Sequence, residues 1–173
     1  MPIVKQIIEA NIAYAKAHEL QHVGPRPVRR LIVLTCMDTR LSIRALGLKP
    51  GDAHILRNAG GTVTEDVLRS IIVSHHFFGT QSVIVINHTD CGMLRFNDRE
   101  LREALKQKHG ADAAVPAEFH SFTDIERNLR EQMQKIRSHP WIPNKMRIAG
   151  FVYDVKTGLL KRVANRRQGS SKR

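Results

Sequence analysis

Two short runs of apolar, largely β-branched residues constrain the fold of this 173-residue chain more than any other feature. They are Leu31–Thr35 and Ser82–Asn87, and residues that can bind a metal follow each of them: Cys36 after the first, His88 and Cys91 after the second. Such runs are typical of buried strands in a parallel sheet. Because sites in open α/β sheets lie at the carboxyl ends of the strands, we expect these three side chains to meet at one edge.

The order of the remaining elements indicates an α/β fold. A strand is expected at 53–57, and an amphipathic helix at 64–79 then leads into the run at 82–87. This strand–helix–strand succession predicts a right-handed crossover and parallel pairing. A further strand is expected at 148–155, and residues 159–163 are expected to turn back as an edge strand beside it.

Length and patterning indicate one domain over residues 1–163, with an amphipathic helical arm at 3–20. The basic stretch 164–173 is predicted to be a disordered tail. No run approaches the roughly 18 apolar residues of a membrane span, so we expect no membrane partner. The amino terminus lacks an apolar segment of signal-peptide length, which favours a cytoplasmic location.

The formal net charge of +12 makes nucleic acid a partner to consider. Aromatic residues make up only 5% of the chain, however, which is sparse for a surface that stacks bases. Much of that net positive excess is local, in the stretch after residue 160. We therefore do not expect nucleic-acid binding, despite the charge.

Cys36, His88 and Cys91 form a candidate zinc site. Zinc binds thiolate and imidazole tetrahedrally, and three protein ligands leave one position open for catalysis, whereas structural sites usually have four. A single buried cysteine is more often an inert core residue. Asp38 is near enough to accept a hydrogen bond from water at such a site, and Arg40 can hold Asp38 in a bidentate pair. The alternative for these two is an ordinary ion pair at a strand end.

Three strings, in their order and spacing, resemble the β-class carbonic anhydrases. They are Cys36-Met37-Asp38-Thr39-Arg40, Arg57-Asn58-Ala59-Gly60-Gly61 and His88-Thr89-Asp90-Cys91-Gly92. The resemblance spans roughly residues 28–163 and includes a hairpin at 150–158 that is similar to the last strands of the family. It implies a three-layer α/β fold with a mostly parallel four-stranded sheet in the order 2-1-3-4. An antiparallel edge strand, helices on both faces, and a homodimer or dimer of dimers are also implied.

The activity that the resemblance implies is the reversible hydration of CO₂ to bicarbonate and a proton by zinc-bound hydroxide. Cys36, His88 and Cys91 would hold Zn²⁺. Asp38 and Arg40 would be the catalytic dyad that orients and gates the nucleophile. In a closed, inactive state of the family, the aspartate leaves the arginine and becomes the fourth ligand, a role that falls to Asp38 here.

Some assignments stay open at the level of sequence. Ala59, Gly60 and Gly61 are candidates for the substrate pocket, with a simple tight turn as the alternative. Asp90 is interpreted as a turn-forming residue. The glutamine with which many plant-type members bind substrate has no evident counterpart here. The same zinc site would also suit the hydrolysis of carbon disulfide or carbonyl sulfide, and a non-catalytic zinc-binding protein is the third possibility.

Overall fold

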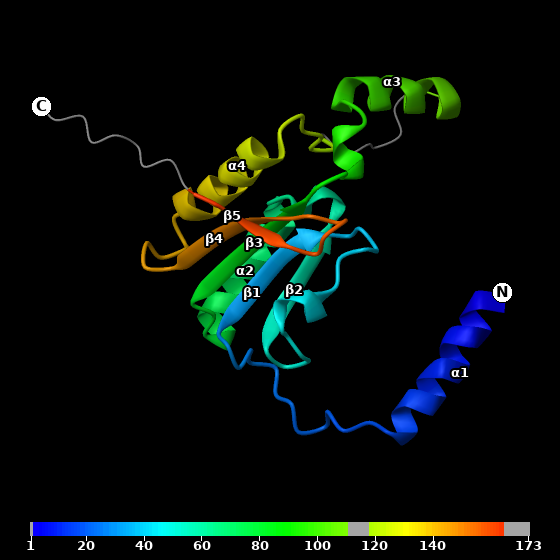
Figure 1. The fold of residues 1–173 in the computed structure, drawn as a ribbon, viewed down its shortest axis with the longest axis vertical. Helices are drawn as coiled ribbons and strands as arrows, with labels where there is room; N and C mark the ends of the chain where they lie inside the picture. Colours follow the sequence, from blue (N-terminus) through cyan, green and yellow to red (C-terminus); the bar gives the residue numbers. More distant parts are fainter. Residues whose placement is uncertain (1, 111–117, 165–173) are drawn as a thin grey trace, which may run out of the picture.

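A computed structural model describes residues 2–110 and 118–164 of the chain. Its centre is one sheet in the order β2-β1-β3-β4-β5 (Figure 1). The first four strands pair in parallel, and β5 is antiparallel to β4. The predicted fold class and strand order are therefore confirmed. The strands are β1 (Leu31–Cys36), β2 (Ala53–Asn58), β3 (Ser82–His88), β4 (Arg147–Tyr153) and β5 (Leu160–Val163).

The two faces of the sheet are covered differently. Helices α2 (Glu65–Phe78) and α4 (Ile125–Ser138) contribute to one core cluster with Ile32, Leu34 and other side chains from the strands. On the opposite face, Val33 and Ile86 form a smaller cluster with Leu48 and with Leu46, the last residue of the 3₁₀ turn η1 (Ile43–Leu46). Alternate residues of each strand thus point to a thick layer and a thin one, as period-2 patterning requires.

The ends of α2 follow from its sequence. The Thr64 side chain accepts a hydrogen bond from the Val67 amide, while Glu65 and Asp66 place negative charge in the first turn. Gly79 ends the helix with φ 75°, a left-handed conformation that glycine adopts without steric cost. These caps lie where the sequence predicts them, and they fix the crossover that leads from β2 into β3.

Helix α1 (Pro2–Lys16) stands away from the sheet in Figure 1, and none of its side chains is buried. It ends four residues before the predicted end of the arm at residue 20. Beyond Lys16 the backbone bonds have 3₁₀ spacing, from the Ala17 amide to the Tyr14 carbonyl at 3.0 Å and from the His18 amide to the Ala15 carbonyl at 3.4 Å. No helix among the described residues combines the length and apolarity of a bilayer span. The predicted tail lies outside the described residues from position 165 onward.

Candidate metal centre

Cys36, His88 and Cys91 come together at the carboxyl edge of the sheet. Cys36 ends β1 and His88 ends β3, and these strands are parallel neighbours. Cys91 follows in the turn that precedes the 3₁₀ turn η3 (Gly92–Leu94). All three are buried, neither cysteine is in a disulfide, and their ligand atoms lie within 4.8 Å of one another. The meeting of the three side chains that the strand pattern predicts is therefore present.

The chemistry of this cluster fits a zinc ion. The Nδ1 atom of His88 lies 2.9 Å from the Thr89 carbonyl, which only accepts, so Nδ1 carries the proton and Nε2 the lone pair. Among the described residues, that Nε2 is the buried side-chain polar atom left without a hydrogen-bond partner. A buried, unpaired acceptor is costly unless something binds it. The imidazole is thus prepared in the tautomer that metal binding needs.

The two thiols influence each other strongly. Hydrogen bonding with the Cys91 thiol lowers the pKa of Cys36 well below its usual range, against the opposing effect of burial. The same contact, with burial, raises the pKa of Cys91. Without a metal the pair therefore favours one thiolate and one thiol. A divalent cation would remove the remaining proton, because Zn²⁺ binds cysteine as thiolate.

Arg57 shapes the turn after Cys36. Its Nε donates to the Cys36 carbonyl at 3.0 Å and its Nη2 donates to the Asp38 carbonyl at 2.5 Å. A cation on β2 thereby fixes the backbone that carries both a candidate ligand and a candidate catalytic carboxylate. Arg57 lies within one of the three strings, but its role needs the position of β2 beside β1 to become visible.

The glycine turn η2 (Ala59–Gly61) packs directly on the strands that carry the ligands. Gly61 has φ 60°, and a Cβ there would lie 3.1 Å from backbone atoms of Thr35, Cys36 and Ile86. Only glycine fits so close to two strands in that conformation. The turn is tight, as one interpretation of the sequence holds. The role of Ala59, Gly60 and Gly61 in a substrate pocket stays a prediction.

A buried chain of amide side chains, Asn87, Asn128 and Gln132, supports that turn from behind. Asn87 at the end of β3 donates to the Gly60 carbonyl at 2.7 Å and accepts from Asn128 of α4 at 3.0 Å. Gln132 donates to Asn128 at 2.8 Å and accepts from the Val63 amide at 2.8 Å. We call these three residues the amide chain. It joins α4, β3 and the glycine turn.

On the solvent side, Asp38 and Arg40 form the predicted bidentate pair. Arg40 donates from Nε to Asp38 Oδ1 at 3.0 Å and from Nη2 to Oδ2 at 2.8 Å. The guanidinium holds the pKa of Asp38 far below its usual range, and the carboxylate raises the pKa of Arg40. Asp38 Oδ2 lies 3.9 Å from Nε2 of His88, so a fixed negative charge borders the cluster. The catalytic part of the pair stays a prediction.

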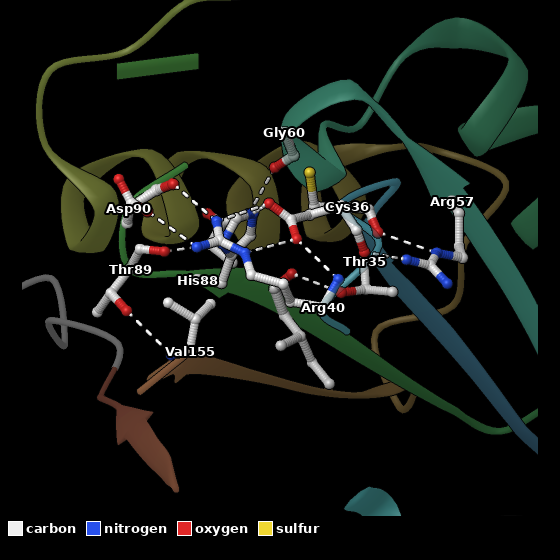
Figure 2. A network of polar contacts seen from close by, with 12 residues as sticks. Thr35, Cys36, Arg40, Arg57, Gly60, His88, Thr89, Asp90 and Val155 are labelled. Carbon is white, nitrogen blue, oxygen red and sulfur yellow. Dashed lines mark hydrogen bonds and ion pairs between the residues drawn. The ribbon is translucent and has the colours of Figure 1, made fainter. Parts of the chain in front are cut away.

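Asp90 does more than form a turn. Its φ of 54° confirms the turn, but its side chain also accepts from Nη1 of Arg40 at 2.8 Å and from Nη2 of Arg95 at 2.8 Å. Its carbonyl accepts a further bond from Nη2 of Arg40 at 3.1 Å. Arg40 and then Arg95 lower the pKa of Asp90. We call Asp38, Arg40, Asp90 and Arg95 the charged chain; Figure 2 shows Arg40 reaching Asp90 beside His88.

Apolar side chains surround the two cysteines, and no sequence motif predicts this feature. One of them, Phe122, comes from far along the sequence and is positioned by Asp98 at the start of α3 (Asp98–His109). The Asp98 carboxylate accepts from the amides of residues 119–121. Burial raises the pKa of Asp98, but these bonds and that of the Ser121 side chain outweigh it and set the pKa at about 2. The apolar set is Leu41, Met93, Leu94, Phe96, Phe122 and Tyr153.

Comparison with known proteins identifies relatives over nearly the whole chain. A family model described as Carbonic anhydrase matches residues 31–160. Beta-carbonic anhydrase 1 of Mycobacterium tuberculosis is 35% identical over 167 residues, which cover 94% of this chain and 99% of that protein. A carbon disulfide hydrolase of Acidianus sp. is 38% identical over 184 residues, with 92% and 90% covered. The crystal structure of a carbonic anhydrase from Streptococcus mutans matches with a TM-score of 0.88 at 44% identity, covering 95% of this chain and 99% of that one.

Proposed function

This chain belongs to the β-carbonic anhydrase family, whose members are zinc enzymes, and on that premise we propose that it hydrates CO₂ reversibly to bicarbonate and a proton. The proposed zinc ligands are Cys36, His88 and Cys91. The observation that carries this proposal is the buried set of three ligand atoms within 4.8 Å, with an unpaired imidazole nitrogen among them. Such a set leaves a fourth position for chemistry.

Zn²⁺, when bound, supplies the Lewis acidity that makes water a nucleophile near neutral pH. The chain's own residues do the rest. Asp38 accepts a hydrogen bond from the reacting water and orients its lone pair toward the carbon of CO₂. Arg40 keeps Asp38 ionised and correctly turned by its two charge-assisted bonds. The apolar side chains around the cysteines suit a substrate without charge.

We further propose that the Asp38–Arg40 pair is a gate. Asp38 Oδ2 is 3.9 Å from Nε2 of His88, so a small rotation away from Arg40 brings the carboxylate to the open side of the ligand set. In that position Asp38 would complete the tetrahedron and exclude substrate. Arg40 favours the open arrangement because it offers Asp38 two bonds that the closed arrangement lacks.

Hydrolysis of carbon disulfide is a second candidate activity. The observation that favours it is the 38% identity to the Acidianus carbon disulfide hydrolase. Carbon disulfide and carbonyl sulfide are linear and apolar like CO₂, and the same ligand set and carboxylate serve either substrate. Parallel assays on one preparation distinguish the activities: stopped-flow hydration of CO₂, and sulfide release from carbon disulfide and from carbonyl sulfide.

Removal of the metal tests both activities and the ligand assignment. We expect one zinc per chain in the purified protein, and loss of both zinc and hydration when a strong chelator removes it. Cys91→Ser and His88→Ala should each lose zinc, because two remaining ligands bind it poorly. His76→Ala, at an exposed histidine on α2, is the matched control and should keep zinc. Full zinc occupancy in Cys91→Ser would refute the ligand set.

We propose that the protein is at least a homodimer. Helix α1 exposes an apolar face, with Ile3, Ile7, Ile8 and Ile12 each more than half exposed. The thin face of the sheet offers a complementary surface, since its outward side chains, such as Ile55 and Phe151, are only partly buried. Sedimentation at micromolar concentration should give a dimer or a larger even assembly, and deletion of residues 1–20 should shift it toward monomer. A fully active monomer would contradict this. The cytoplasmic location stays a prediction.

A further inference from the structure

We propose that Asp90 is a positioning residue that holds Arg40 in the orientation in which Arg40 grips Asp38, and that Arg95 anchors Asp90. This inference rests on the proposed function, because the orientation of Arg40 matters to the reaction only if Asp38 takes part in it. It adds two residues to the dyad and makes the active arrangement depend on a chain of four charges.

Arg40 needs such a support. Its side chain is 42% exposed and has several rotatable bonds, and an exposed ion pair by itself fixes such a side chain poorly. The structure shows the guanidinium held on two edges. Nε and Nη2 face Asp38, while Nη1 donates to the Asp90 carboxylate and Nη2 also donates to the Asp90 carbonyl. Rotation of the guanidinium that breaks its bonds to Asp38 therefore also strains its bonds to Asp90.

Asp90 is itself held in place. Its left-handed backbone, with φ 54°, turns carbonyl and carboxylate toward the same guanidinium. Each carboxylate oxygen then binds a different arginine: Oδ2 accepts from Arg40 and Oδ1 from Arg95, both at 2.8 Å. The two positively charged arginines on either side of the Asp90 carboxylate form a charge network. Exposed ion pairs contribute measurably to stability when they belong to such a network.

Loss of this support should affect turnover more than substrate binding. Asp90 and Arg95 touch Asp38 only through Arg40, and CO₂ carries no charge for either to recognise. A loosened Arg40 lets Asp38 leave the orientation in which it accepts from the reacting water, and misplacement of a catalytic group by about 1 Å costs up to about 10²-fold in rate. We therefore expect a fall in kcat with little change in KM.

Asp90→Asn is the sharpest variant, because asparagine has the same shape and also tolerates a positive φ, so the carbonyl contact to Arg40 survives. We expect about a 10-fold fall in kcat and a KM within about 2-fold of the original. Arg95→Ala removes a side chain that is 70% exposed and should reduce kcat about 3-fold, and Arg95→Lys should recover part of that loss. Arg99→Ala removes a still more exposed arginine, 84% against 70% for Arg95, that pairs with Glu103 on α3, and it should change neither constant.

A second readout needs no turnover and no metal. The Nε–H proton of Arg40 donates to Asp38, so its exchange with solvent, followed by NMR of the arginine Nε–H signals, reports how firmly the guanidinium is held. Exchange should be faster in Asp90→Asn and in Arg95→Ala, in both zinc-loaded and metal-free protein, and unchanged in Arg99→Ala. Zinc content should match the original protein in every variant.

The Arg40→Ala background separates this inference from the function on which it rests. If Asp90 acts through Arg40, then adding Asp90→Asn to Arg40→Ala should cost nothing further. An equal loss in both backgrounds would overturn the inference, and so would unchanged kcat and Nε–H exchange in both Asp90→Asn and Arg95→Ala. If Arg40→Ala itself were as active as the original protein, the proposed dyad would fail instead.

Discussion

The amide chain and the charged chain both border the candidate metal centre, and they differ in burial and in charge. Asn87, Asn128 and Gln132 are neutral and no more than 6% exposed. Asp90 and Arg95 in the charged chain are 49% and 70% exposed. Each chain contains one side-chain to side-chain hydrogen bond between segments far apart in sequence, Asn87–Asn128 in the amide chain and Arg40–Asp90 in the charged chain. The comparison shows that one site can have a buried support whose hydrogen bonds are fixed, the amide chain, and an exposed support whose hydrogen bonds can rearrange, the charged chain.

The physical reason for the contrast is solvent. In the buried amide chain every broken bond leaves a polar group without water, so the chain moves only at a high cost in stability. In the charged chain, water can replace a lost partner and screen the charges, so the chain adds little stability and its members can exchange partners. We therefore expect variants of the two chains to separate stability from activity.

The largest expected effect is on activity, from Arg40→Ala. Loss of the two bonds to Asp38 should favour the closed arrangement and reduce hydration by about 10²-fold or more, since oriented charged groups at a reacting centre have effects of that size. The loss should be greatest below neutral pH, where water rather than hydroxide competes with Asp38. Stopped-flow pH–rate profiles and thermal unfolding check this. If Arg40→Ala had the same rate as the original protein at every pH, the Asp38–Arg40 pair would be an ordinary ion pair. A large fall in the melting temperature of Arg40→Ala would contradict the expectation that the charged chain affects activity more than stability.

The next effect is on stability, from Asn128→Ala in the amide chain. Asn87 and Gln132 would each lose a buried partner, which should cost about 2–4 kcal/mol in free energy of unfolding. Urea unfolding of the zinc-loaded protein measures it, and Asn144→Ala at an exposed asparagine is the control. The kcat should fall less than in Arg40→Ala. A variant of normal stability with a large loss in kcat would reverse the roles that we assign to the two chains.

The smallest expected effect concerns Asp98. Its carboxylate is charged, like the members of the charged chain, but it is held by backbone amides, which hold neither chain together. Its folded pKa of about 2 lies below its unfolded pKa of about 3.9. The stability that it contributes is therefore fully present above about pH 4 and is lost as the pH falls toward 2. Asp98→Asn should lower the free energy of unfolding at neutral pH, and its difference from the original protein should shrink on acidification. A difference independent of pH would show that ionisation of Asp98 is not what stabilises the 119–121 segment.

Sequence patterns predicted the sheet and the ligand set because both depend on local spacing. An apolar run ends where its strand ends, so Cys36 and His88 are fixed at the carboxyl edge as soon as their runs are recognised as parallel strands. Asp38 and Arg40 lie two residues apart, and their pairing follows from the same short string. The predicted end of α1 at residue 20 was wrong: apolar periodicity continues past Lys16, but the helix ends there and the next backbone bonds have 3₁₀ spacing.

The supports of the site were decided only by the tertiary structure. Asn87 lies near the end of the apolar strand β3 and Asn128 lies on an amphipathic helix, and nothing in either segment shows that they face each other across 41 positions. Arg40 and Asp90 are 50 positions apart, and Asp98 meets residues more than 20 positions away. Spacing along the chain determines which side chains share a strand end, so the sequence alone predicted that Cys36, His88 and Cys91 would lie together. Hydrogen-bond partners across such separations depend on how helices and turns pack on the sheet, which only the folded chain fixes.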